Sequence, residues 1–189
     1  MPLRLSLCLG IMFIAGCGDN DSSTGPDQTT DEIMVIINEI NYNSADNFNP
    51  DDWVELYNAG DSQADVSGWI FKDEDDAHEF VLPDSTVITT GGFLVLCADT
   101  TAFGSLFPEV GNYEGNVPFG FSGGGELLRL FDSAGELIDQ VAYDDAAPWP
   151  AEADGLGATL TLLNPEADNM LPGNWAASSG HGTPGAANY

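Results

Sequence analysis

Two acidic segments hold the residues whose types and spacing could bind a metal ion. Their carboxylates lie within a few positions of one another: Asp46, Asp51 and Asp52 in the first segment, and Asp73, Asp75 and Asp76 in the second. Calcium takes about six to eight oxygen ligands, so either segment could supply part of a site, although neither has the spacing of an EF-hand loop. A run of acidic residues more often only faces water. We therefore predict no cofactor and keep Ca2+ as the alternative for these aspartates.

Two further patterns could serve catalysis. Residues 120–124 match the G-x-S-x-G form of a nucleophile elbow at Ser122, and His181 follows later in the chain. That elbow needs a helix after it, whereas the residues from 126 onward have the pattern of a strand. Glu55, between two aromatic residues, could be a general acid with a raised pKa or a buried carboxylate held by backbone N–H groups or by an Arg or Lys. No second catalytic group is fixed beside it, so we predict no catalytic residues and no enzyme activity.

The charge of the chain excludes several kinds of partner. Among 189 residues, 31 are Asp or Glu and 3 are Lys or Arg, which gives a formal net charge of -28. Proteins that bind DNA or RNA draw most of their affinity from Lys and Arg at phosphates, so we expect no nucleic acid partner. The chain is 43% hydrophobic and 10% aromatic, which is too apolar for an acidic disordered protein and enough to bury a core.

The N-terminus has the pattern of a lipoprotein signal. Residues 1–16 contain one Arg, no acidic residue and an apolar stretch that is too short to span a bilayer. The Ile14-Ala15-Gly16-Cys17 segment resembles a bacterial lipobox, in which the cysteine is acylated and becomes the new N-terminus. Ordinary secretory cleavage, which would leave Cys17 as a free thiol, is the alternative.

We therefore predict a lipoprotein signal peptide over residues 1–16 and lipidation of Cys17. The lipid would attach the protein to a bilayer on the non-cytoplasmic side of the cell envelope, at the outer membrane or cell surface in a Gram-negative cell. Residues 17–32 are predicted to form an acidic flexible linker, because 18–32 contain no aliphatic or aromatic residue. Removal of the signal would leave a side-chain charge of 2 - 31 = -29.

From residue 33 onward, short apolar runs alternate with clusters of Gly, Pro, Asn and Asp, which is the pattern of an all-β sandwich or barrel. One helical turn is expected near residues 101–107, and the Gly-rich segment 180–185 is expected to lie irregularly along the domain or to fray. Strands are predicted over residues 34–42, 53–58, 69–72, 79–82, 86–88, 93–98, 127–131, 138–143 and 159–163.

Several motifs occur in a fixed order along residues 33–189. They include Asn38-Glu39-Ile40, Trp53-Val54-Glu55-Leu56-Tyr57-Asn58, Ser67-Gly68-Trp69, Ser122-Gly123-Gly124-Gly125-Glu126 and Gly182-Thr183-Pro184-Gly185. Together they resemble the lamin tail domain family in its bacterial form, and the Trp-Val-Glu-Leu-Tyr-Asn block with the later Ser-Gly-Trp is the most specific part. The resemblance implies an immunoglobulin-like β-sandwich over residues 33–189.

These observations predict a non-enzymatic, lipid-anchored envelope protein that presents one Ig-like domain for binding an envelope protein or surface ligand, or for scaffolding. An accessory module of a secreted hydrolase or nuclease and a calcium-dependent surface adhesion module are the alternatives. Trp149, between two prolines, is the candidate for an aromatic presented to a partner, with a cap over one end of the core as the alternative. Cys97 is expected to be a buried, inert residue.

Overall fold

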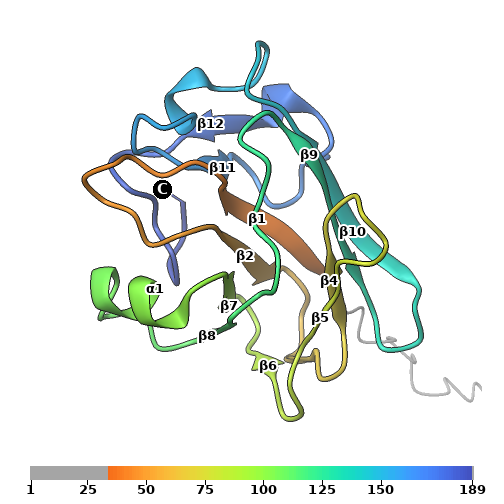
Figure 1. Cartoon of the computed structure of the whole chain (residues 1–189). Helices are drawn as coiled ribbons and strands as arrows, with labels where there is room; N and C mark the ends of the chain where they lie inside the picture. The colour runs from red at the N-terminus through yellow and green to blue at the C-terminus, as the bar shows by residue number, and fades with distance from the viewer. Residues whose placement is uncertain (1–33, 189) are drawn as a thin grey trace, which may run out of the picture. The chain divides into compact units, whose positions relative to one another are not determined.

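The structure is a computed structural model that describes residues 34–188. The predicted signal peptide, Cys17 and the predicted linker lie outside the described residues. Within residues 34–188 the chain forms two larger β-sheets around a shared core, a small two-stranded sheet and one short helix (Figure 1). No helix in this part of the chain is long and apolar enough to cross a membrane.

The larger sheet has six strands. Their order across the sheet is β12 (Trp175–Ala177), β11 (Leu160–Leu162), β1 (Val35–Asn41), β2 (Trp53–Asn58), β7 (Phe93–Cys97) and β8 (Tyr113–Gly115). All neighbours are antiparallel except β7 and β8. The first strand of the described chain is therefore paired on one side with a strand from the C-terminal part of the sequence.

The second large sheet has four strands, in the order β10 (Leu137–Tyr143), β9 (Glu126–Phe131), β4 (Ile70–Lys72) and β5 (Phe80–Val81). The small sheet pairs β3 (Ala64–Asp65) with β6 (Val87–Ile88). The helix α1 (Thr100–Leu106) follows β7, and two 3-10 turns precede β11 and β12, namely η1 (Ala151–Ala153) and η2 (Pro172–Asn174).

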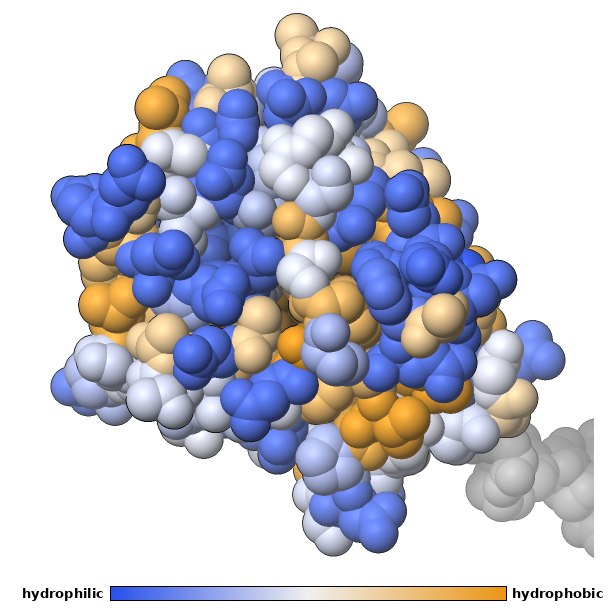
Figure 2. Space-filling view, viewed as in Figure 1, coloured by the Kyte–Doolittle hydropathy of each residue, from blue (hydrophilic) through white to orange (hydrophobic). Residues whose placement is uncertain are grey.

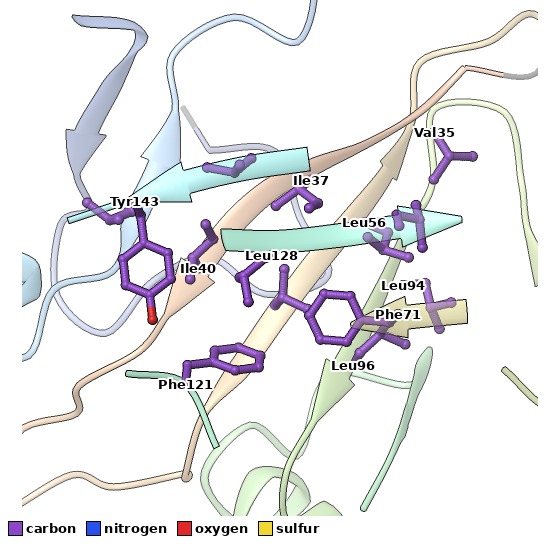
Figure 3. Close-up of a cluster of buried hydrophobic side chains, with 14 of the residues drawn as sticks. Val35, Ile37, Ile40, Leu56, Phe71, Leu94, Leu96, Phe121, Leu128 and Tyr143 are labelled. Atoms are coloured by element: carbon purple, nitrogen blue, oxygen red, sulfur yellow. The ribbon is translucent and has the colours of Figure 1, made fainter. Parts of the chain in front are cut away.

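Alternation along the strands places apolar side chains between the two large sheets. In β2, Val54 and Leu56 are fully buried in the shared core, while the residues between them point to the opposite face of the sheet. Phe71 and Leu128 of the four-stranded sheet belong to the same buried cluster (Figure 3). Burying one such side chain contributes about 1.5–3 kcal/mol, so this layer is the main source of stability.

The all-β, immunoglobulin-like fold predicted from the sequence is confirmed. A strand overlaps each of the nine predicted ranges, and β2 has the predicted bounds. The strands β3, β8 and β12 were not predicted; each has two or three residues. The helix α1 begins one residue earlier than predicted, with Asp99 as its N-cap. The carboxylate of Asp99 accepts hydrogen bonds from the backbone N–H groups of Thr101 and Ala102.

Asp139 joins the edge strand β10 to the other sheet. Its Oδ2 accepts a hydrogen bond from Ile37 N of β1 at 2.6 Å and another from Asn169 Nδ2 at 2.7 Å. The pairing of β1 with β2 shifts register directly after Ile37, and the carboxylate supplies an acceptor for the amide at that irregularity. Burial raises the pKa of Asp139, although both hydrogen bonds act in the opposite direction.

Replacing Asp139 with Ala should lower the free energy of unfolding by about 1–3 kcal/mol, because the buried amide of Ile37 would lose its acceptor. Urea unfolding followed by tryptophan fluorescence measures the difference. Asp61 is exposed, and Asp61→Ala removes the same charge, so that variant should change stability by less than about 0.5 kcal/mol. Equal effects of the two substitutions would contradict the role given to Asp139.

Candidate functional site

The outer face of the six-stranded sheet, opposite the shared core, carries two fully buried glutamates. Trp53, Glu55 and Tyr57 alternate along β2 onto this face. Trp53 is fully buried there against Phe103 of α1, with ring centroids 6.0 Å apart. The helix therefore covers one end of the outer face, and Glu55 comes next along the strand.

A second covering element is the stretch of residues 181–188, which we call the C-terminal segment. It crosses two glutamates that lie opposite each other in register, Glu39 of β1 and Glu55 of β2. Thr183 N donates to Glu39 Oε1 at 3.1 Å, and Gly185 N donates to Glu55 Oε2 at 2.5 Å. Two backbone amides of an irregular segment thus find their acceptors on two fully buried carboxyl groups.

Neutral side chains complete the hydrogen bonding around the pair. Thr159 Oγ1 donates to Glu39 Oε1 at 2.5 Å, and Asn38 Nδ2 donates to Glu55 Oε1 at 2.9 Å. Asn188 Nδ2 donates to the backbone oxygen atoms of Asn38 at 3.2 Å and of Leu162 at 3.0 Å. These last two bonds attach the end of the C-terminal segment to the sheet.

The two glutamates are buried without a neutralising cation among the described residues. Residues 34–188 contain two Lys or Arg residues, Lys72 and Arg129, and both form ion pairs with acidic residues elsewhere. Burial raises the pKa of Glu39 to about 7. Burial, together with the negative charge of Glu39, raises the pKa of Glu55 to about 8. Near neutral pH the pair therefore retains protons that exposed glutamates would have lost.

The outer face also contains an apolar groove of about 200 Å³ beside the C-terminal segment. Tyr57 and Phe93 pack together in its lining, with ring centroids 4.9 Å apart. Sites for small molecules usually measure about 300–1,000 Å³, so this groove has room for one or two side chains of a partner. Its lining residues are Asn38, Tyr57, Gly91, Phe93, Leu162, Pro165, Ala187 and Asn188.

The aspartates that were candidates for calcium mostly make separate contacts. Asp52 Oδ2 accepts from Phe121 N at 2.7 Å, whereas Asp73 Oδ1 accepts from Asp75 N at 2.7 Å. Within residues 34–188 no group of three or more His, Cys, Asp or Glu side chains is arranged to hold a metal ion. Calcium binding at Asp46, Asp51, Asp52, Asp73, Asp75 or Asp76 stays an untested alternative to the prediction of no cofactor.

The structure places Trp149 in the core, as the alternative of a cap over one end of the core predicted. It is 6% exposed and packs against Trp175 of β12, with ring centroids 5.9 Å apart. Both rings belong to the buried core. The large apolar indole is more stable beneath the strands than in water, and Trp149 closes one part of the core, as the alternative interpretation required.

The other residues considered for chemistry are engaged in structural contacts. Ser122 Oγ accepts from Gly124 N at 3.2 Å in the turn before β9, so a strand follows this serine, as predicted. The ring of His181 stacks on Phe48 at 3.8 Å between centroids. Cys97 is fully buried, and burial raises the pKa of its thiol to about 12, which fits the predicted inert role.

Sequence reasoning identified one member of the buried pair and missed the other. Glu55 was expected to be a carboxylate held by backbone N–H groups or by a cation, and the structure confirms the backbone N–H. Glu39 is the one charged residue of β1, in an otherwise neutral seven-residue strand, and this signal could have indicated a buried acid. The groove had no local signal, because its lining comes from segments that are far apart in the sequence.

Gly182 is a test of how tightly the C-terminal segment fits. Its φ is +90°, and a Cβ at this position would lie 2.6 Å from Glu39 Oε1. Gly182→Ala should lower the free energy of unfolding by about 2 kcal/mol or more, because the contact adds to a left-handed strain of about 1–2 kcal/mol. At Gly180, φ is +71° and a Cβ would meet nothing within 4 Å, so Gly180→Ala measures the strain alone. Equal losses in thermal unfolding would show that the segment does not press on Glu39.

Comparison with known proteins assigns the chain to a family. No curated protein matches the sequence. The family model of the lamin tail domain matches residues 28–145, which is more than half of the chain. The match ends earlier than the motif resemblance implied, so β11, β12 and the C-terminal segment lie beyond it although they complete the same sheet. With this match and the Ig-like sandwich in agreement, the chain belongs to the lamin tail domain family.

Proposed function

We propose that the protein is a non-enzymatic binding module, attached to the cell envelope through lipid on Cys17, that holds another protein in the groove of the outer sheet face. The groove carries this proposal: it is an apolar hollow that contains two packed aromatic rings. Membership in a family of non-catalytic Ig-like domains supports a role in protein interaction or scaffolding.

The chemistry of the groove suits a side chain of a protein better than a free small molecule. Tyr57 and Phe93 offer a large contact area at a low cost in side-chain entropy, and aromatic residues are enriched at protein interfaces. The amide side chains of Asn38 and Asn188 also line the groove, but they are bonded to Glu55 and to the sheet, so they fix the shape of the groove. A volume of about 200 Å³ accommodates a small apolar side chain of such a segment.

Charge narrows the chemistry of the partner. Five of the 31 acidic residues precede residue 34, so residues 34–188 contain 31 - 5 = 26 acidic residues against two Lys or Arg. The face in Figure 2 is mostly hydrophilic, with apolar side chains in small separate areas. Electrostatic complementarity favours a partner that presents Lys or Arg beside the apolar side chain. The occupant proposed for the groove is thus a basic, extended polypeptide segment.

A peptide of alternating lysine and valine tests this assignment. We expect it to shift the amide NMR signals of Gly91 and Phe93 in the full chain, because these residues line the groove. The shifts should be lost in Tyr57→Ser and retained in Val81→Ser, which removes an exposed apolar side chain from β5 of the other sheet. A glutamate and valine peptide should not bind. Shifts that survive Tyr57→Ser, or that occur away from the groove, would refute the assignment.

The envelope anchor has its own test. Each buried methylene of an acyl chain contributes about 0.8 kcal/mol, and stable attachment takes more than one chain, which an acylated N-terminal cysteine provides. When the full chain is expressed in a bacterium, it should sediment with membranes, and Cys17→Ser should move it to the soluble fraction. Cys8→Ser lies inside the predicted signal peptide and should leave the distribution unchanged. Membrane association that persists in Cys17→Ser would exclude the lipid anchor.

A further inference from the structure

The C-terminal segment forms part of the binding groove as well as the cover of the two glutamates. Ala187 and Asn188 line the groove, while Thr183 and Gly185 of the same segment bond to the buried pair. We propose that the C-terminal segment is a proton-controlled cover of the outer sheet face, closed while Glu39 and Glu55 hold protons and released as the pair ionises. This inference rests on the proposed function only for its consequence, the control of groove binding.

The geometry leaves the pair no other way to reduce its charge. Glu39 and Glu55 are 0% exposed and lie opposite each other on neighbouring antiparallel strands, where side chains are about 5 Å apart at Cβ. Their hydrogen-bond donors, among them Asn38 and Thr159, are neutral, and both Lys or Arg residues of the described chain are paired elsewhere. Two negative charges at this distance in a poorly solvated site repel each other strongly. A proton on the pair removes that repulsion as long as the cover is closed.

The hydrogen-bond network provides a place for such a proton. Thr183 Oγ1 lies 3.4 Å from Glu39 Oε2 and 3.2 Å from Asn188 Oδ1. A proton on Glu39 Oε2 can be donated to the hydroxyl oxygen of Thr183, whose own proton goes to Asn188. Loss of that proton replaces a donor by a second negative charge, directly beneath the backbone of the segment.

The ionisable groups around the pair do not offset this charge. Thr161 of β11 lies opposite Glu39 in register, and Thr159, directly before that strand, donates to Glu39; neither threonine is ionisable. The helix α1 contains no ionisable residue. From the C-terminal segment, His181 is directed to Phe48 and to Gly157 O, 3.0 Å from its Nδ1. The loop after α1 brings Val110 to Gly185, and its one ionisable residue, Glu109, is acidic. Further along the outer face, β7 and β8 carry Cys97, Tyr113 and Glu114, which are neutral or acidic.

The direction of the pH effect follows from the raised pKa values. In the closed protein the pKa of Glu39 is about 7 and that of Glu55 about 8, whereas a solvated glutamate has a pKa near 4.5. The closed state therefore binds more protons than the open state between these limits. Closure is most stable below about pH 4.5, loses stability as the pH rises through about 7 and 8, and levels off above that range.

Release would change the groove as well as the pair. Asn188 holds its place by bonds to Asn38 O and Leu162 O, and both of these residues also line the groove. Loss of the segment removes one side of the groove and uncovers Glu55 next to Tyr57. A basic segment that fits the closed groove would then meet a wider surface with two additional negative charges.

Amide hydrogen exchange of the full chain without any peptide tests the cover directly. After correction for the intrinsic rate, protection of the Thr183 and Gly185 amides should fall by up to about tenfold per pH unit between pH 5 and 7 for each proton released. Protection should become constant above about pH 8. The amides of β7 serve as the internal reference and should show no such fall. Protection of the segment that is independent of pH, or that falls equally in β7, would overturn the proposal.

Variants separate this mechanism from a general effect of charge. Glu39→Gln and Glu55→Gln cannot ionise, so either should reduce the pH dependence of exchange in the segment. Glu136→Gln removes an exposed glutamate in the β9–β10 turn and should keep the full dependence. If the Gln variants do not fold, the pH dependence of amide exchange in the wild-type segment, compared with β7, still tests the proposal. The exchange experiment contains no peptide, so a failure of peptide binding to the groove would not change its result. Equally, exchange that does not depend on pH would refute the cover and leave the groove assignment unaffected.

Discussion

The described structure depends on carboxyl groups that are buried with very few cations to neutralise them. With 26 acidic residues and two Lys or Arg between residues 34 and 188, ion pairing can serve only a small minority of the acids. The buried and half-buried carboxylates accept long-range bonds from neutral side chains and from backbone N–H groups instead. Asp52 accepts from Phe121, Asp139 from Ile37, Glu39 from Thr183 and Glu55 from Gly185. Each of these bonds joins segments that are distant in the sequence, so acidic side chains act as the connectors that hold irregular segments onto the sandwich.

This way of satisfying carboxylates has an electrostatic cost that cation pairing would not have. Burial raises the pKa of Asp52 to about 7 and raises the pKa of Asp139 as well, despite the amide donors. A buried carboxylate that accepts one or two N–H bonds is less stable as an anion than one in water, because hydration is lost over its whole surface. These carboxyl groups therefore stabilise the fold most where they are protonated or where water still reaches them. The stability of the fold and its dependence on pH are thus linked to the same group of residues.

The sequence was sufficient for the parts of the fold that repeat a local pattern. Short apolar runs between turn residues located β1, β2 and β7, and Asp99 with the following residues located α1. The sequence was insufficient where a role depends on tertiary contacts. Trp149 between two prolines gives no local sign that Trp175 lies against it. Glu55 was interpretable because it interrupts an aromatic face, whereas its partners, the amide of Gly185 and the carboxyl group of Glu39, are brought to it only by the fold.

The part of the chain beyond the family match completes the six-stranded sheet and half of the groove. The matched residues end at Asp145, and without the later residues β1 would be an edge strand with unpaired backbone groups. The later part of the chain pairs β11 with that edge and lays the C-terminal segment over Glu39 and Glu55. The groove lies on the seam between the two parts: Tyr57, Gly91 and Phe93 come from the matched region, and Leu162, Pro165, Ala187 and Asn188 from beyond it. Half of the proposed binding surface is thus supplied outside the region matched to the family, so the identity of the partner has to be sought from this chain and not from other lamin tail domains.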